Sequence, residues 1–183
     1  MNRIFSRKLL LRQLGEKDLP LISEWSFSSE SHGEYLSLEK LSLEECQQRY
    51  MSGYFWNKGS KDFIIELKKE GVPIGTIRYW LKPESPETAV VSLKIARSEL
   101  RRKGYGYESQ KMLINYLFTN EHVKIIVMYT AINNIPQQKS LVKLGFDFVD
   151  SVTYCDQGIN RTGFIYQLTK IKFRTLFQYS VAE

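Results

Sequence analysis

The stretch that decides the fold reads SLKIA at residues 92–96 and, after a connector of four residues, RRKGYGY at residues 101–107. The first segment has the apolar composition of a strand, and residues 107–118 have the spacing of an amphipathic helix. Gly104 and Gly106 lie in the turn between them. A strand, a glycine turn and a helix in this order present backbone N–H groups and the positive end of a helix dipole to an anion. The stretch predicts a pyrophosphate site.

Three consecutive cations, Arg101, Arg102 and Lys103, precede the first of these glycines. They would add charge-assisted contacts to the same anion, and the glycines would let the backbone approach it closely. Two other interpretations stay open for the isolated pattern. A glycine turn after a strand is often plain chain reversal, and a run of cations is often only solvated.

Composition limits the remaining choices. The chain has 183 residues, a formal charge of +6 and a pI near 9.2. This length and composition predict a single globular domain over residues 1–183. Apolar runs are too short to span a bilayer and the start does not resemble a signal peptide, so we expect a cytoplasmic protein. Two cysteines and two histidines make a zinc site improbable.

Strand and helix patterns alternate along the rest of the chain. Residues 63–67 and 77–81 alternate apolar with polar positions and predict a hairpin, and residues 123–131 predict a buried central strand. Asn134 and Pro136 open a helix that ends before Gly145. Residues 26–36 are polar and rich in breakers, which predicts a loop.

Together these segments resemble the GNAT superfamily of acyl-CoA N-acyltransferases. That superfamily's signature is Arg or Gln, two residues, Gly, one residue, then Gly or Ala, which Arg101, Gly104 and Gly106 match. The other segments that carry the resemblance are LRQL at 11–14 with Asp18 and Trp25, IGTI at 74–77, and Asn134 followed by KLGF at 143–146. Within the superfamily the chain is most similar to the ribosomal-protein-alanine (Rim-type) N-acetyltransferases.

The resemblance implies an α+β fold in α/β/α layers. Its mixed, mostly antiparallel central sheet would have about seven strands, a splay between the fourth and fifth strands, and helices on both faces. The pantetheine arm of acetyl-CoA would enter the splay and pair with Lys94, Ile95 and Ala96 like an added strand. The cofactor-binding residues would then be completed by Arg101, Arg102, Lys103, Gly104, Tyr105, Gly106, Tyr107 and Asn134.

The implied activity is acetyl transfer from acetyl-CoA to a primary amine, either a protein N-terminus or a small molecule, by direct attack in a ternary complex. Such a reaction benefits from a base for the amine and an acid for the thiolate. The chain departs from its relatives at the positions that often supply them. The usual Tyr is Leu141, the usual Ser is Gln137, and the usual Glu falls at Val90 or Val91.

The remaining candidates for proton transfer are His32 and Glu34 in the first interhelical segment, Glu66 on a strand, and Tyr154 near a strand end. Each has an ordinary structural alternative: a solvated loop histidine, surface carboxylates, and a buried tyrosine with a satisfied hydroxyl. The sequence does not choose between these alternatives and catalysis.

The expected partners are acetyl-CoA and an amine acceptor, without metal, membrane or nucleic acid, in a monomer or homodimer. Two alternative functions stay open. One is a catalytically idle CoA-binding sensor or structural member, which the missing Tyr, Ser and Glu favour. The other is a basic nucleic-acid-binding module, which the positive charge favours, although the cations are scattered and no nucleic-acid motif is present.

Overall fold

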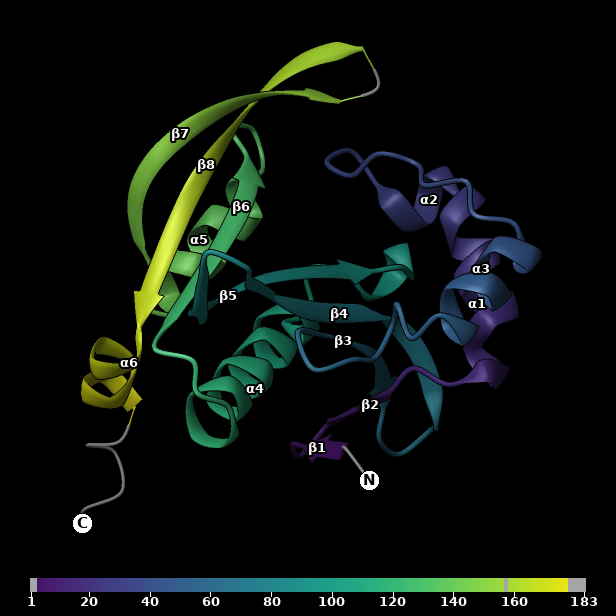
Figure 1. The fold of residues 1–183 in the computed structure, drawn as a ribbon, viewed down its shortest axis with the longest axis horizontal. Helices are drawn as coiled ribbons and strands as arrows, with labels where there is room; N and C mark the ends of the chain where they lie inside the picture. The colour runs from purple at the N-terminus through teal and green to yellow at the C-terminus, as the bar shows by residue number, and fades with distance from the viewer. Residues whose placement is uncertain (1–2, 157, 178–183) are drawn as a thin grey trace. The chain divides into compact units, whose positions relative to one another are not determined.

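The computed structural model describes residues 3–156 and 158–177 (Figure 1). The chain forms two compact units. The first unit holds Met1–Trp80 and Leu93–Met112, and the second holds Leu81–Ser92 and Leu113–Glu183. Among the described helices, none is both long and apolar enough to cross a bilayer.

The first unit is built on four antiparallel strands, which are β1 (Arg3–Phe5), β2 (Leu9–Gln13), β3 (Ser60–Leu67) and β4 (Val72–Lys82). Leu11 pairs with Ile65, and Phe63 pairs with Ile77. These four side chains are fully buried, which fixes the register because a slip by one residue would expose them. The hairpin predicted from residues 63–67 and 77–81 is therefore confirmed.

Helices cover one side of this core. They are the 3-10 turn η1 (Glu16–Asp18), α1 (Leu19–Phe27), α2 (Ser29–His32) and α3 (Leu43–Met51). Buried side chains of α1, α3, β3 and the segments that connect them form one cluster, made of Leu14, Leu19, Leu41, Cys46, Phe55 and Ile64. The prediction of a loop over residues 26–36 is wrong at α2. Its polar composition hides a single helical turn that begins where the Ser28 hydroxyl accepts the Ser31 N–H.

The next strand, β5 (Ser85–Ile95), runs through η2 (Ser98–Leu100) to the helix α4 (Tyr105–Asn120). At its end the Ala96 N–H donates to the Ile74 carbonyl of β4. The backbones approach so closely here that a Cβ on Gly75 would lie 2.0 Å from the Lys94 carbonyl oxygen. Only glycine fits at this point of contact between β4 and β5.

The second unit contains β6 (Ile125–Ala131), α5 (Ile135–Lys143), β7 (Asp147–Asp156), β8 (Ile159–Thr169) and α6 (Lys170–Phe177). The first part of β5 pairs in parallel with β6, and β8 is antiparallel to both β6 and β7. Ile126, Val127 and Met128 of β6 are buried, as the apolar run in the sequence predicts.

The eight strands follow the order β1-β2-β3-β4-β5-β6-β8-β7. The sheet is mixed and mostly antiparallel, so the predicted α+β class is confirmed, with β1 as a strand beyond the expected seven. Within the described residues, the ladder between β5 and β6 runs from Thr88–Ile125 to Val90–Val127, whereas the strands continue to Ile95 and Ala131. This pairing therefore stops before the SLKIA segment begins.

Candidate functional site

The glycine turn lies directly before α4 in the first unit. Gly104 has φ +86° and Arg102 has φ +60°, both in the left-handed region. A Cβ on Gly104 would meet no atom within 4 Å, so glycine is favoured there by its backbone angle rather than by lack of space. The Glu108 N–H donates to the Gly104 carbonyl at 3.0 Å, which begins the helix. The N–H groups of a first helical turn have no intrahelical acceptor, so this end of α4 suits an anion.

Gly106 brings the start of α4 against β5. A Cβ there would lie 3.5 Å from Leu93 Cδ1 and 3.8 Å from Ile95 Cγ1. Because side chains alternate along a strand, Lys94 points to the opposite face of β5. The glycine turn thus lies between the end of β5 and the start of α4, the two segments that the sequence predicts to form one anion site. Arg102, Lys103 and Gly104 of the turn are exposed.

The Arg101 side chain is engaged inside the first unit. Its Nε donates to the Ile95 carbonyl at 2.9 Å, and Nη2 donates to the carbonyls of Ser31 at 2.9 Å and Glu30 at 2.5 Å. Gly33, with φ +68°, leaves room for this guanidinium, since a Cβ there would lie 2.9 Å from Nη1. Arg101 therefore ties α2 to the end of β5, and the exposed cations beside the turn are Arg102 and Lys103.

His32 is buried at the end of α2 with both ring nitrogens near polar atoms. Nδ1 lies 3.0 Å from the Ser28 carbonyl oxygen, which can only accept, so Nδ1 carries the proton and donates. Nε2 is left with a lone pair, 3.5 Å from Lys94 Nζ. Burial lowers the pKa of His32 below 6.5, helped by the positive charges of Lys94 and Arg101. The imidazole is therefore neutral near pH 7.

Lys94 approaches His32 from β5 and is partly buried. Burial lowers the pKa of its amine below 10.5. The charge of Glu39 opposes this shift, and the smaller effect of the Arg101 charge adds to it. The family resemblance implies a backbone role for Lys94, and nothing in the sequence places residue 32 beside residue 94. The side-chain contact is a finding of the structure.

The other predicted proton-transfer residues have surroundings of a different kind. Glu34 is exposed. Glu66 accepts from Arg12 Nε at 2.7 Å, and Arg12 also binds Asp18 through both terminal nitrogens, so an ion-pair network accounts for Glu66. Tyr154 belongs to the second unit, where it is 41% exposed on β7 and not buried.

Asn134 is the N-cap of α5 in the second unit. Its Oδ1 accepts the Gln137 N–H at 3.3 Å, and a proline follows within the first turn. The helix-opening interpretation is confirmed, while contact of the Asn134 amide with acetyl-CoA stays a prediction. Position 141 is a fully buried leucine, whose hydrocarbon side chain has no proton to donate.

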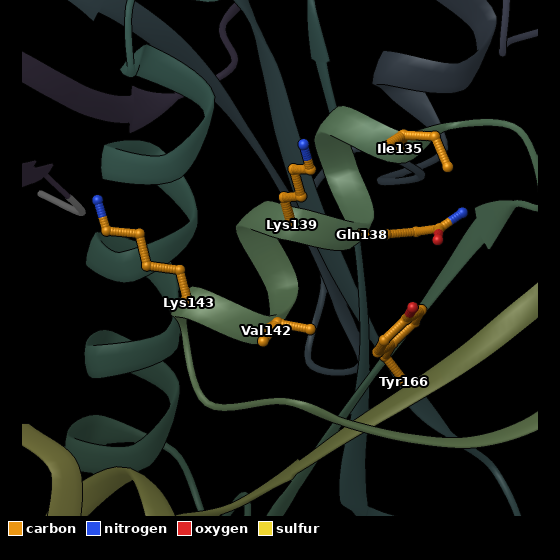
Figure 2. A pocket seen from close by; sticks show the side chains of 6 residues that line it. All are labelled: Ile135, Gln138, Lys139, Val142, Lys143 and Tyr166. Carbon is orange, nitrogen blue, oxygen red and sulfur yellow. The ribbon is translucent and has the colours of Figure 1, made fainter.

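The second unit also has a groove along α5 (Figure 2). Its lining residues are Ile135, Gln138, Lys139, Val142, Lys143 and Tyr166. Ile135, Gln138 and Val142 point to the side on which Tyr166 of β8 lies (Figure 2). Their spacing of three and four residues is the sequence signal that marks this helix face. None of the site residues predicted from the sequence lines the groove.

A buried carboxylate in the first unit was not predicted from the sequence. Asp62 of β3 is 7% exposed, and its Oδ1 lies 3.3 Å from Arg78 Nε of β4 without hydrogen-bond geometry. Burial raises the pKa of Asp62 to about 7, although the charge of Arg78 opposes this. The residues that the structure describes include no group of three His, Cys, Asp or Glu side chains that could hold a metal ion.

The amino-acid sequence of the chain matches a known protein family. Residues 8–147 match the family model described as an acetyltransferase (GNAT) domain. None of the curated proteins matches the chain.

Solved structures share the fold over nearly the whole chain. An acetyltransferase of the GNAT family from Bacillus anthracis has 18% identity and a TM-score of 0.77, covering 93% of this chain and 99% of its own. The aminoglycoside acetyltransferase AAC(6')-Ib, in complex with coenzyme A and kanamycin, has 21% identity and a TM-score of 0.76, covering 91% and 98%. RimL, a ribosomal L7/L12 alpha-N-protein acetyltransferase in complex with coenzyme A, has 13% identity and a TM-score of 0.78, covering 92% and 98%.

Proposed function

The chain belongs to the GNAT family of acetyltransferases, and from this membership we propose that it acetylates a primary amine by direct attack in a ternary complex. The acyl donor is acetyl-CoA. The observation that supports the proposal most is the glycine turn packed against β5 at the start of α4, because it joins an anion site to a strand end in one unit.

The proposed donor site uses two parts of that turn. The pyrophosphate of acetyl-CoA contacts backbone N–H groups at residues 102–107 together with the exposed side chains of Arg102 and Lys103. The pantetheine arm pairs with the main chain of residues 94–96. Within the described residues of the second unit, the β5–β6 ladder ends at Val90, before the main chain that this proposal assigns to pantetheine.

His32 is the proposed general base. Its Nε2 has a lone pair, and burial keeps the ring neutral near pH 7. The neutral acceptor amine gives a proton to Nε2 as its nitrogen attacks the thioester carbon, and the C–S bond breaks. The thiolate then takes up that proton and leaves as coenzyme A. Proximity of the two substrates can supply about 7–11 kcal/mol of the barrier reduction, so an acid at position 141 is not essential.

Two structural neighbours act on or bind amines of different kinds. RimL is named for acetylating the N-terminus of a ribosomal protein, and AAC(6')-Ib is bound to kanamycin, an aminoglycoside. Both neighbours have identities too low to carry more than the fold. We therefore propose a protein N-terminus or a small-molecule amine as the acceptor.

We further propose that both units belong to one catalytic domain, residues 1–183. The family match supports this, since residues 8–147 run through parts of both units.

The test is thermal stabilisation by coenzyme A followed by thiol release from acetyl-CoA with a panel of amines and N-terminal peptides. Stabilisation with thiol release that depends on one amine class is the expected result. Stabilisation without release by any amine would favour the idle CoA-binding alternative. If coenzyme A does not stabilise the protein and no amine gives thiol release, the proposal is overturned.

A further inference from the structure

The side chains of His32 and Lys94 are placed as a base and a nucleophile would be, with His32 as the base and Lys94 as the nucleophile. Nε2 of His32 and Nζ of Lys94 are 3.5 Å apart, and the donation from Nδ1 to the Ser28 carbonyl orients the ring. An amine is activated when it is desolvated, when it lies near other cations, or when a base is within hydrogen-bond reach. Lys94 meets all three conditions.

Burial, more than the neighbouring charges, disfavours the ammonium form of Lys94. Arg101, tied to the Ile95 carbonyl, disfavours that form, while Glu39 favours it. His32 on α2 faces Nζ and is itself neutral near pH 7. Within the described part of the chain, His32 Nε2 is the only hydrogen-bond partner of Nζ, and Lys94 makes no ion pair. A partly buried lysine whose amine makes no ion pair loses its proton more easily than an exposed one.

We propose that Lys94 is a self-acetylation site, modified by acetyl-CoA bound to the same molecule when no acceptor amine is present. This inference rests on the proposed function, because it needs the thioester to reach the main chain of residues 94–96. Lys94 is then the amine closest along the chain to the reacting carbon and the one already paired with the proposed base.

The step balances without another reactant. Neutral Nζ attacks the thioester carbonyl carbon, the new N–C bond forms, and the C–S bond breaks. One amine proton passes to His32 Nε2 and is then given to the departing thiolate, so the products are Nζ-acetyl-lysine and coenzyme A. An amide is far less reactive than a thioester, so the product is a lasting modification and not an intermediate of amine transfer.

The experiment incubates the full chain with acetyl-CoA without added amine and maps acetylation by peptide mass spectrometry. Lys94→Arg is compared with Lys69→Arg, a matched change at an exposed lysine. Acetylation at position 94 is expected to saturate with acetyl-CoA and to have a first-order rate independent of protein concentration. Lys94→Arg removes that signal, and Lys69→Arg retains it.

His32→Gln tests the role of the base. It is expected to slow acetylation of Lys94 by about 100-fold while stabilisation by coenzyme A is kept. Because His32 is buried and this variant can fail to fold, the wild-type pH profile gives an independent measurement. The rate ratio of Lys94 to Lys69 is expected to be highest near neutral pH and to fall toward pH 10.5, where an ordinary lysine also loses its proton.

Three results would overturn the inference in different ways. If Lys94 is acetylated no faster than Lys69 while amine-dependent thiol release proceeds, self-acetylation is wrong and the proposed function stands. If coenzyme A does not stabilise the protein and no amine gives thiol release, both fail together. A ratio that stays constant across the pH range would also contradict the buried base pair.

Discussion

Burial determines the charge of Asp62, with consequences for the pH dependence of stability. Its carboxyl lies inside the first unit beside Arg78, and burial raises its pKa from 3.8 to about 7. Such a shift means that the folded state favours the protonated acid. The protonated Asp62 carboxyl makes a contribution to the free energy of unfolding that is fully present below pH 3.8 and is lost as the pH rises through about 7.

Asp62→Asn is therefore expected to change the pH dependence of folding. The difference between the two pKa values corresponds to about 4 kcal/mol as an upper figure. The free energy of unfolding of the variant, relative to wild type, should rise between pH 4 and pH 8 as the wild-type carboxyl ionises. Urea unfolding at a series of pH values measures this difference. Asp147→Asn, at an exposed ion pair with Lys172, is the control, and an equally steep change there would refute the assignment.

The lowered pKa of His32 leads to a prediction for the pH dependence of catalysis. Because its pKa is lowered from 6.5 by burial, the acidic limb of kcat/KM should have its midpoint below pH 6.5. His32→Gln should lower kcat/KM at neutral pH by about 100-fold and remove that limb, while coenzyme A affinity changes little. Steady-state rates between pH 5 and pH 8 decide this. A wild-type midpoint above pH 7 would assign the base to another group.

Two neighbouring arginines are predicted to have separate roles. Arg101→Met removes three bonds to main-chain carbonyls and should destabilise the fold by about 2 kcal/mol. Arg102→Met, at an exposed side chain, should leave stability unchanged and weaken coenzyme A binding by about 5-fold, which corresponds to about 1 kcal/mol. Thermal unfolding and calorimetric titration separate these effects. Equal losses of stability in both variants would contradict the distinction.

At the scale of elements, the contact between β4 and β5 depends on a single missing methyl group. Gly75→Ala would place a Cβ 2.0 Å from the Lys94 carbonyl oxygen, against backbone that cannot turn away. We expect a loss of about 3 kcal/mol, because overpacking forces the strands apart. Gly59→Ala is the matched control, since its Cβ would meet Asn57 Oδ1 at an ordinary 3.7 Å. Unfolding midpoints that shift equally for both variants would show that the close approach is unimportant.

Elements with local signals could be predicted from the sequence. The start of α5 depends on Asn134 and Pro136, two residues apart, and the structure has Asn134 as the N-cap with the proline in the first turn. The glycine turn is local in the same sense. In contrast, the bonds from Arg101 to Ser31 and from Lys94 to His32 join residues about 60 to 70 positions apart. Hydrophobic patterning sets strand register but gives no information on which polar side chains meet across it.

At the scale of the whole molecule, net charge and the anion site make different predictions for ligand binding. A charge of +6 attracts any anion over distances that salt screens, whereas the glycine turn offers fixed N–H groups whose geometry salt does not change. Coenzyme A binding should therefore weaken with salt and yet persist when the side-chain contacts are screened. Binding to nucleic acid through charge alone would disappear.

Hydrogen exchange over the full chain can locate the cofactor. Added coenzyme A should slow amide exchange most at residues 94–96 and 102–107, because these are the N–H groups that the proposal pairs with pantetheine and pyrophosphate. Exchange in β7 and in the turn of β3 and β4 at Gly71 should stay unchanged and serves as the internal reference. Slower exchange at the start of α5 would support a contact of Asn134 with the cofactor. Protection confined to α5 and β8 would instead assign the ligand to the groove at Tyr166 and exclude the glycine turn as its site.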